Sequence, residues 1–391
     1  MKRCLLYLLI VLSVFPAQAA HALKTENLQV SLLTVMPRPN EIYTVYGHTA
    51  LRLYDPAQQI DIAFNWGTFD FQAPHFLYRF IKGETDYFLS TSDYAYFLRA
   101  YSQGNATVTE QVLNMTPEGK EKLLQILSLN LLPENRVYRY NFLFDNCTTR
   151  VRDLIEDCTG ASLVYPVQAE KATFRQLIHS CTAAYPWMTF GIDLLIGSGA
   201  DSTVSLRQEL FLPLRLKEAL DRSVAAPSVP VVASVERVLV SSPGDDSTPA
   251  ALDFPLITGY CLFFLCLVAG WAGWRRKRLF GGFFAPLFFL AGAAGCLVGF
   301  TALFSEHPCT SPNWNLLWLH PFHWIAFAGY FLKKKPFFLG FHAINLALLL
   351  AVLAGWRWIP QALNPANIPY ILCLAVADAQ YLLFFKDAWK S

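Results

Sequence analysis

Almost every residue from Phe254 to the C-terminus is apolar, and this region constrains the fold more than any other feature of the chain. Each apolar segment approaches the roughly 20 residues that a helix needs to cross a bilayer. Five membrane helices are therefore expected, at 254–274, 280–304, 316–332, 337–356 and 367–385. Residues 251–391 are predicted to form an all-α membrane domain.

The positive charges around these segments predict their orientation. Arginines and lysines follow the first segment at 275–278, the third at 333–335 and the last at 386 and 390. Cytoplasmic loops carry an excess of such residues. The loops at 305–315 and 357–366, and the whole region 23–250, are thus expected on the outer side of the membrane.

The N-terminus independently predicts export. Lys2 and Arg3 precede an apolar stretch from Cys4 to Phe15, and small residues follow up to Ala22. This is the layout of a secretory signal peptide at 1–22, and the stretch is short for the alternative, a retained membrane anchor. The net charge of +2, without a basic aromatic patch, argues against nucleic acid as a partner.

Residues 23–222 have the mixed composition of a globular α+β domain. Alternating apolar residues predict strands at 28–34, 49–54, 60–65 and 107–114. Helical spacing predicts a helix at 116–132, with Thr116 as its cap and Pro117 in its first turn. Residues 223–250 are rich in Ser, Pro, Ala and Val, which favours an extended linker.

Cys147 lies in YNFLFDNCTTRVRDL, where apolar residues give way to polar ones. Asp145 or Asn146 can cap a helix there, with Val151 and Leu154 on its buried side. The first turn of a helix favours negative charge, so a thiol at this position loses its proton more readily. The amide groups of the same turn can stabilise an oxyanion. Cys147 is therefore the candidate nucleophile.

A cysteine nucleophile needs a base, and His48 is the best candidate. It lies in YTVYGHTALRLYD, at the start of a predicted strand, where Gly47 allows a close backbone approach. His21, His75 and His179 lie in less ordered contexts or near the cleavage point. The one rival thiol is Cys309, in the outer loop.

The segments GHTALRLYD, FNWGTFDF and YNFLFDNCTTRVRDL resemble the circularly permuted papain-like group, which includes lecithin–retinol acyltransferases and permuted NlpC-type hydrolases. The whole chain is similar to the Lnb type of bacterial lipoprotein N-acyltransferase. WMTFGIDLLIGSGAD at 187–201 and HPCTSPNWNLLWLHPFH at 307–323 also match that family. The resemblance implies a papain-like periplasmic domain at 23–222 joined to a helical membrane domain.

The resemblance also implies Cys147 as nucleophile and His48 as general base. A third polar group should orient the histidine, and Asn65 on the next strand is preferred. Asp61 shares the face of Asn65 by period two, and Asp70 is a further alternative.

Five residues are expected to bind substrate. Asn146 and Trp66 lie within the matching motifs. His307, Asn313 and Asn315 lie in an outer loop, where they would meet lipid headgroups. The alternative for this loop is a solvated turn anchored by its tryptophans.

Other polar residues are assigned structural roles. Asp193 and Asp201 lack a His or Cys at ligand spacing, so no metal is expected, and no cofactor is required. Cys158 and Cys181 face an oxidising compartment and can pair as a disulfide, although the sequence does not set connectivity.

A helical membrane domain beside a thiol site favours chemistry on lipids, because a lipid substrate must leave the bilayer sideways. The expected function is transfer of a fatty acyl group, through a thioester on Cys147, to the N-terminal cysteine amine of diacylglyceryl lipoproteins. The donor is an ester of the lipoprotein itself or of a membrane phospholipid. The expected location is the bacterial inner membrane. The alternatives are a tethered cysteine peptidase or amidase acting on cell-wall peptide, and a non-catalytic assembly or sensor protein.

Overall fold

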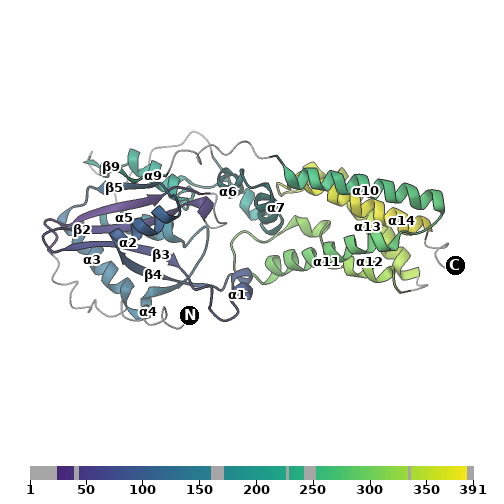
Figure 1. Ribbon diagram of the computed structural model, residues 1–391, viewed down its shortest axis with the longest axis horizontal. Coiled ribbons are helices and arrows are strands. Elements are labelled where there is room, and N and C mark those ends of the chain that lie inside the picture. Colours follow the sequence, from purple (N-terminus) through teal and green to yellow (C-terminus); the bar gives the residue numbers. More distant parts are fainter. Residues whose placement is uncertain are drawn as a thin grey trace. The chain divides into compact units, whose positions relative to one another are not determined.

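The computed structural model describes residues 24–38, 44–159, 171–225, 229–241, 252–332 and 336–384 (Figure 1). They form two compact units. The first unit comprises the described residues within 1–79, 84–170 and 205–246, and the second, the membrane unit, those within 80–83, 171–204 and 247–391. The predicted signal peptide and the lysines at 333–335, 386 and 390 lie outside the described residues.

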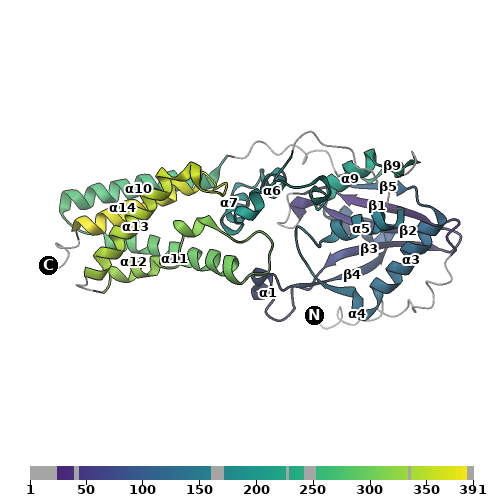
Figure 2. The same ribbon diagram turned by 180° about the vertical axis from the view of Figure 1, so that it is seen from behind.

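The first unit is built on an antiparallel sheet with the strand order β6-β4-β3-β2-β1-β5-β9 (Figures 1 and 2). The predicted strands are confirmed as β1, β2, β3 and β5, with ends that differ by a few residues. The seven strands are β1 (Gln29–Val35), β2 (His48–Asp55), β3 (Ile60–Thr68), β4 (Asp86–Asp93), β5 (Val108–Leu113), β6 (Val137–Arg139) and β9 (Val232–Leu239).

Strand β9 corrects the expectation of a linker over 223–250. Val232 to Leu239 pair antiparallel with β5 and form an edge of the sheet, so this stretch is an integral part of the first unit. A short ribbon of β7 (Val224–Ala225) and β8 (Val229–Pro230) precedes it. The partner strand of β9 lies more than a hundred residues earlier in the chain, so composition near residues 223–250 does not indicate the pairing.

Helices cover both faces of this sheet. On one face the main core joins Leu51 and Phe64 of the sheet to Leu123 of α3 (Pro117–Leu131) and Ile155 of α5 (Cys147–Thr159). On the other face a smaller core includes Ala50 and Ala63 of the sheet and Phe97 of α2. The remaining helices here are α1 (Phe76–Lys82), which runs into the membrane unit, α2 (Tyr94–Gln103), α4 (Pro133–Arg136), α8 (Leu206–Glu209), α9 (Pro213–Arg222) and the 3-10 turn η2 (Thr44–Tyr46).

Local capping explains where α3 begins. The side chain of Thr116 accepts a hydrogen bond from the amide of Gly119 at 3.1 Å, and Pro117 occupies the first helical position. Both features satisfy the requirements of a helix N-terminus, as the sequence predicts.

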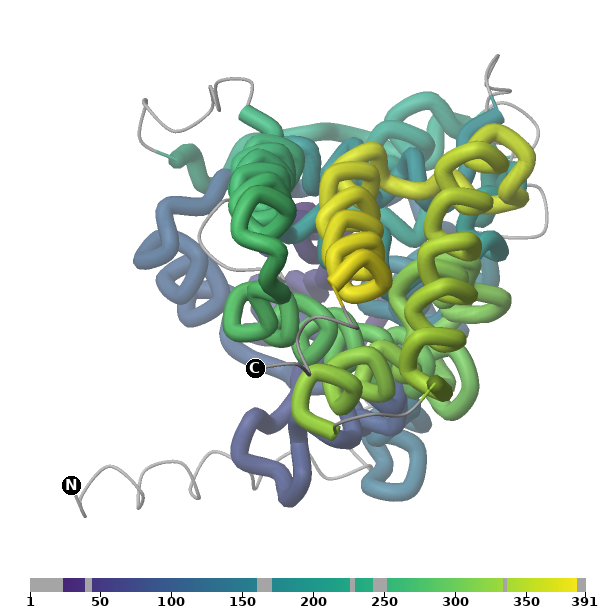
Figure 3. Tube along the Cα trace, turned by 90° about the vertical axis from the view of Figure 1, so that its right-hand side faces the viewer, coloured from purple at the N-terminus to yellow at the C-terminus, as the bar shows by residue number. Residues whose placement is uncertain are grey.

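Four helices of the membrane unit are long and apolar enough to cross a bilayer, among the residues that the structure describes. In Figure 3, α14 lies between α10 and α13, and it contacts both. The four helices are α10 (Phe254–Arg276), α11 (Gly281–Phe304), α13 (Pro336–Ala354) and α14 (Asn367–Phe384).

The segment predicted as the third span, 316–332, is different. It contains the end of the 3-10 turn η4 (Trp314–Leu317) and the short helix α12 (His323–Gly329). Pro321 lies between them and has no amide hydrogen to donate, which interrupts a continuous helix.

The membrane unit also includes part of the region predicted as the exported domain. It contains α6 (Phe174–Thr182), α7 (Pro186–Leu195) and the 3-10 turn η3 (Ser198–Asp201). Helix α7 contacts α10 and α11. A further 3-10 turn, η5 (Trp356–Trp358), precedes α14.

Candidate active site

Cys147 is the first residue of α5, as predicted, and Asn146 caps this helix. The Asn146 side-chain oxygen accepts hydrogen bonds from the amides of Thr148 and Thr149 at 2.8 and 2.9 Å. Its side-chain nitrogen donates to the carbonyls of Phe142 and Phe211. Asn146 is thus a buried structural cap, and its role as a substrate contact stays a prediction.

The same cap limits the oxyanion site that the sequence predicts. Because Asn146 takes the amides of Thr148 and Thr149, two helix-start donors are already occupied. The amide of Cys147 itself is the helix-start donor that Asn146 does not take. The thiol is half-buried beside it.

His48 opens strand β2, and its neighbour Gly47 shapes the approach. Gly47 has a φ of +77°, and a Cβ there would lie 2.5 Å from the carbonyl oxygen of Val35. Only glycine fits this backbone. The imidazole Nε2 of His48 lies 3.2 Å from the side-chain oxygen of Asn65 on β3. The side chain of His48 also forms a hydrogen bond with that of Cys147.

The electrostatics favour an ion pair between these side chains. Burial has the largest effect on His48 and would lower its pKa, but the charge of Cys147 and hydrogen bonds with Cys147 and Asn65 raise that pKa above its ordinary value. Burial would likewise raise the pKa of the Cys147 thiol, but attraction to His48 and hydrogen bonds from His48 and the Thr49 amide lower it. A thiolate beside an imidazolium is the activated form of a cysteine nucleophile.

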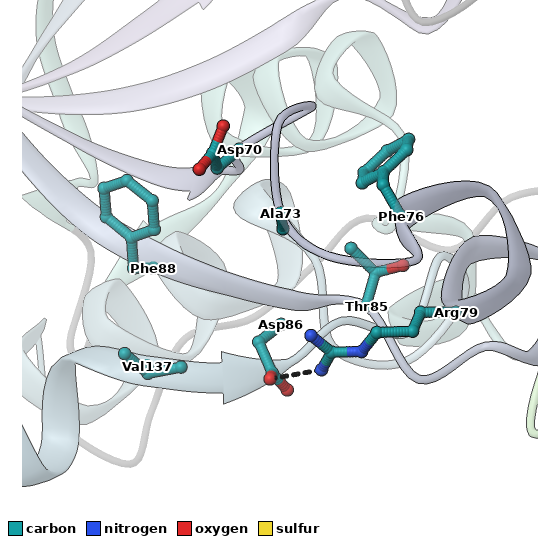
Figure 4. A pocket seen from close by; sticks show the side chains of 8 residues that line it. All are labelled: Asp70, Ala73, Phe76, Arg79, Thr85, Asp86, Phe88 and Val137. Atoms are coloured by element: carbon teal, nitrogen blue, oxygen red, sulfur yellow. Dashed lines mark hydrogen bonds and ion pairs between the residues drawn. The ribbon is translucent and has the colours of Figure 1, made fainter.

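Of the three groups that the sequence offers to orient His48, the structure brings Asn65 to it. Asp61 instead forms a two-pronged ion pair with Arg52, at 2.7 and 2.9 Å. Asp70 accepts a hydrogen bond from the Gln72 amide and lines a separate hollow (Figure 4).

That hollow lies near α1 and the ends of β4 and β6 and has no nucleophile. Figure 4 shows the ion pair between Arg79 and Asp86 at its edge. It is lined by Asp70, Ala73, Phe76, Arg79, Thr85, Asp86, Phe88 and Val137.

Trp66, the other motif residue that was expected to contact substrate, is a core residue. Its side chain is 1% exposed and packs in the main core. Successive residues of a strand point to opposite faces, so Trp66 faces the core because Asn65 faces His48.

Four residues near the thiol were not predicted. Gly67 has a φ of +89°, and a Cβ there would lie 3.6 Å from the Cβ of Cys147 and 4.0 Å from the ring of Tyr140. The Thr49 hydroxyl lies 3.1 Å from that of Thr148 and joins β2 to α5. A glycine inside a strand pattern signals a close approach, so FNWGTFD carried a signal for Gly67. Nothing local to the sequence indicates Tyr140.

The predicted polar residues of the outer loop lie in the membrane unit, and two of them are buried. The Asn313 side chain donates to the carbonyls of Leu194 and Leu195, and that of Asn315 donates to the carbonyl of Asp193 at 2.9 Å. Both asparagines thus hold the loop against the end of α7.

His307, the third predicted residue of this loop, is half-buried. Its Nε2 donates to the Phe80 carbonyl at 2.6 Å. It therefore ties the loop to residues 80–83 of its own unit.

Arg175 organises the rest of this outer region. Its guanidinium, with a side chain 3% exposed, donates to Asp193 and Asp201 at 2.7 Å each, and to the carbonyl of Gly197. Burial would raise the pKa of Asp193, but hydrogen bonds and charge from His179 and Arg175 lower it. Asp193 and Asp201 thus hold an arginine, and no cluster able to bind a metal is found among the described residues.

The remaining described cysteines form no disulfide. Cys158 is buried in α5 of the first unit, and Cys181 lies in α6 of the membrane unit. Burial raises the pKa of Cys309, more than the nearby charge of Arg175 lowers it. The rival thiol is therefore poorly suited to act as a nucleophile.

Comparison with known families decides the assignment. The model of the Lnb N-terminal periplasmic domain matches residues 15–180, and the model of the Lnb transmembrane domain matches residues 248–388. The chain belongs to the Lnb family. No curated protein and no solved structure matches it.

The Lnb assignment makes this chain a membrane protein with a periplasmic domain. The Lnb periplasmic model covers His48, Asn65 and Cys147 together. The Lnb transmembrane model covers the outer loop and all four long helices.

Proposed function

We propose that this protein is a lipoprotein N-acyltransferase of the inner membrane that works through a thioester on Cys147. The observation that carries the proposal is the grouping of Cys147, His48 and Asn65, in which charge and hydrogen bonding favour a thiolate beside an imidazolium. Membership of the Lnb family and the apolar helices support a lipid substrate.

In the first step, the Cys147 thiolate attacks the carbonyl carbon of a fatty acyl ester. A carbon–sulfur bond forms, and the negative charge moves to the carbonyl oxygen, beside the amide of Cys147. Collapse of this intermediate breaks the ester bond. The departing alcohol takes the proton of the His48 imidazolium, and a thioester remains.

In the second step, the α-amino group of a lipoprotein's N-terminal cysteine attacks the thioester. Neutral His48 accepts the proton of the amine, and the collapse expels the Cys147 thiolate. The product is an amide-linked acyl chain, and the enzyme returns to its ion-pair form. Asn65 keeps the imidazole oriented in both steps through its bond to Nε2.

The acyl donor is an ester on a diacylglyceryl lipoprotein or on a membrane phospholipid. Both present the same chemistry, a fatty acyl ester at the membrane surface. The donor is an ester, so its acyl group passes to the thiol and then to the amine by exchange. Neither a metal nor a nucleotide is required to balance the reaction.

The test is mass spectrometry of a reporter lipoprotein's N-terminal peptide. It uses cells depleted of their own N-acyltransferase that express the intact protein, Cys147→Ala or Cys261→Ala. Cys261 is an exposed cysteine of α10 and serves as the matched control. The intact protein and Cys261→Ala should add one amide-linked acyl group, and Cys147→Ala should add none.

Loss of one glycerol ester from the same peptide would identify the lipoprotein itself as donor. If the intact protein is present in the membrane and adds no acyl group, the proposal is wrong. Muropeptide profiles with and without Cys147→Ala would then test a cell-wall hydrolase.

A further inference from the structure

A continuous row of aromatic side chains runs through the first unit, starting beside the candidate nucleophile. Gly67 lies between Cys147 and Tyr140, within van der Waals reach of both for a built Cβ. The ring of Tyr140 stacks on Tyr87 with centroids 4.1 Å apart. Tyr87 in turn lies 4.9 Å from Phe69.

The row continues from Phe69 to the start of α1. The Phe69 ring lies 4.5 Å from Phe71 and 5.8 Å from Phe76, and these two rings lie 5.2 Å apart. Phe76 also lines the hollow of Figure 4, together with the apolar side chains of Phe88 and Val137. We call Tyr140, Tyr87, Phe69, Phe71 and Phe76 the aromatic row.

The end of the row farthest from Cys147 is open to solvent. Phe71 is 62% exposed, and α1 has no buried residue. Leu77 and Tyr78 on α1 are 69% and 54% exposed. Neighbouring apolar side chains of this size rarely stay in contact with water unless they bind a partner.

The chain itself indicates that this partner is a lipid. Helix α1 runs into Phe80–Gly83, which belong to the membrane unit. The carbonyls of Ile81 and Lys82 accept hydrogen bonds from the Ser305 hydroxyl and the Glu306 amide, at 2.9 and 2.8 Å. Ser305 directly follows α11, a membrane-spanning helix.

Gly83 shows how closely these segments approach. It has a φ of +77°, and a Cβ there would lie 2.8 Å from the His307 amide nitrogen. The last residues of α11, Leu303 and Phe304, are 73% and 62% exposed. The turn that ends α1 thus adjoins an apolar surface that meets lipid.

We propose that the aromatic row binds the fatty acyl chain of the donor, with the ester carbonyl at Cys147 and the chain extending toward Phe71 and Phe76. This inference rests on the proposed function. In it, the aromatic row is the part of the first unit that makes the enzyme prefer a donor with a long acyl chain. Apolar contact along the row stabilises a long chain and adds nothing for a short one.

The test measures kcat/KM of the purified full-length protein in detergent micelles with two esters, p-nitrophenyl palmitate and p-nitrophenyl butyrate. Phe71→Ser is chosen because Phe71 is mostly exposed, so the fold should tolerate it. It should lower kcat/KM for the palmitoyl ester about tenfold, the effect of losing roughly one aromatic contact, and change the butyryl ester less than about twofold.

Two further variants serve as controls. Phe71→Leu keeps an apolar side chain and should restore most of the preference for palmitoyl. Tyr96→Ser removes an aromatic residue of α2 that is 67% exposed in the same unit, and should leave both esters unchanged. An equal loss on both esters with Phe71→Ser, or no loss on either, overturns the proposal.

Cys147→Ala separates this proposal from the proposed function. If it abolishes cleavage of both esters while Phe71→Ser leaves their ratio unchanged, the aromatic row is wrong and the nucleophile stands. If Cys147→Ala still cleaves both esters, the proposed function itself fails. If Phe71→Ser impairs only transfer to a peptide amine, the row binds the acceptor peptide and not the acyl chain.

Discussion

Asn65 offers the sharpest test of the candidate active site, because one hydrogen bond links it to His48. Asn65→Ala removes the 3.2 Å contact to His48 Nε2 and leaves the backbone of β3 in place. A hydrogen bond to a charged group contributes about 1.5 kcal/mol or more, which is about tenfold in rate. We therefore expect acyl transfer to slow about tenfold, with Cys147 still able to form the thioester.

The pH dependence of the rate shows in which direction Asn65→Ala should act. Thioester formation needs the Cys147 thiolate and the His48 imidazolium, so its rate rises as the thiol ionises and falls as the imidazolium loses its proton. Asn65 accepts a hydrogen bond from the charged ring and helps to raise the pKa of His48. Asn65→Ala should lower that pKa and move the alkaline limb of the profile to lower pH.

Asn65→Asp should act in the opposite direction. A carboxylate beside His48 favours the imidazolium and, by repulsion, opposes the thiolate. Both limbs of the profile should move to higher pH. The assay is the pH profile of kcat/KM for p-nitrophenyl butyrate.

Asp61→Ala is the matched control for these variants. Asp61 lies on the same face of β3 but pairs with Arg52, so its removal should leave both limbs in place. If Asn65→Ala and Asn65→Asp shift the alkaline limb in the same direction, or neither shifts it, Asn65 does not act through the charge of His48.

Substitutions at three further positions test interactions within each unit. Arg175→Ala removes an ion-pair partner of the buried Asp193 and of Asp201, and should cost about 3 kcal/mol, seen as a lower melting temperature in detergent. Arg175→Lys should not restore that stability, because a single ammonium group cannot match the forked geometry of the guanidinium. Asp378→Ala removes the acceptor of His342 Nδ1, 2.7 Å away and fully buried, and should cost about 3 kcal/mol by the same measurement. Asn146→Ala removes the cap of α5 and should cost about 1–2 kcal/mol of stability, measured by denaturant unfolding of the full-length protein, and unchanged unfolding would contradict the capping role.

The sequence predicts the parts of the site that depend on local chemistry. Asn146 caps the helix that begins at Cys147, and a cap acts within a few residues of its own position. The choice between Asn65 and Asp61 needs more, because both have the same parity on β3. The strand register decides it: Leu51 pairs with Phe64, which brings Asn65 toward the His48 end of β2, whereas Asp61 pairs with Tyr54.

Other features of the structure differ from what the local sequence suggests. Asn315 is bound to a carbonyl 122 residues away, so an outer loop that looks free to meet headgroups is instead packed against α7. Side chains alternate between the two faces of a strand, so Trp66 and Asn65 point to opposite faces of β3. The core on the face of Trp66 includes residues of α3 and α5, which come later in the chain. The interrupted span at 316–332 shows that hydrophobicity alone does not make a continuous helix when a proline lies inside the segment.

The order of segments along the chain has a consequence for how the protein can be divided. The first unit is interrupted by Phe80–Gly83 and by Lys171–Val204, which belong to the membrane unit. A cut after Arg222, the boundary that composition predicts, would remove β9 and leave the edge of β5 unpaired. The same cut would separate Arg175 and Asp193 from Asn315, which binds the end of α7. Neither unit is therefore a continuous segment, and the unit that carries the candidate active site is covalently joined to the membrane unit at each of these crossings.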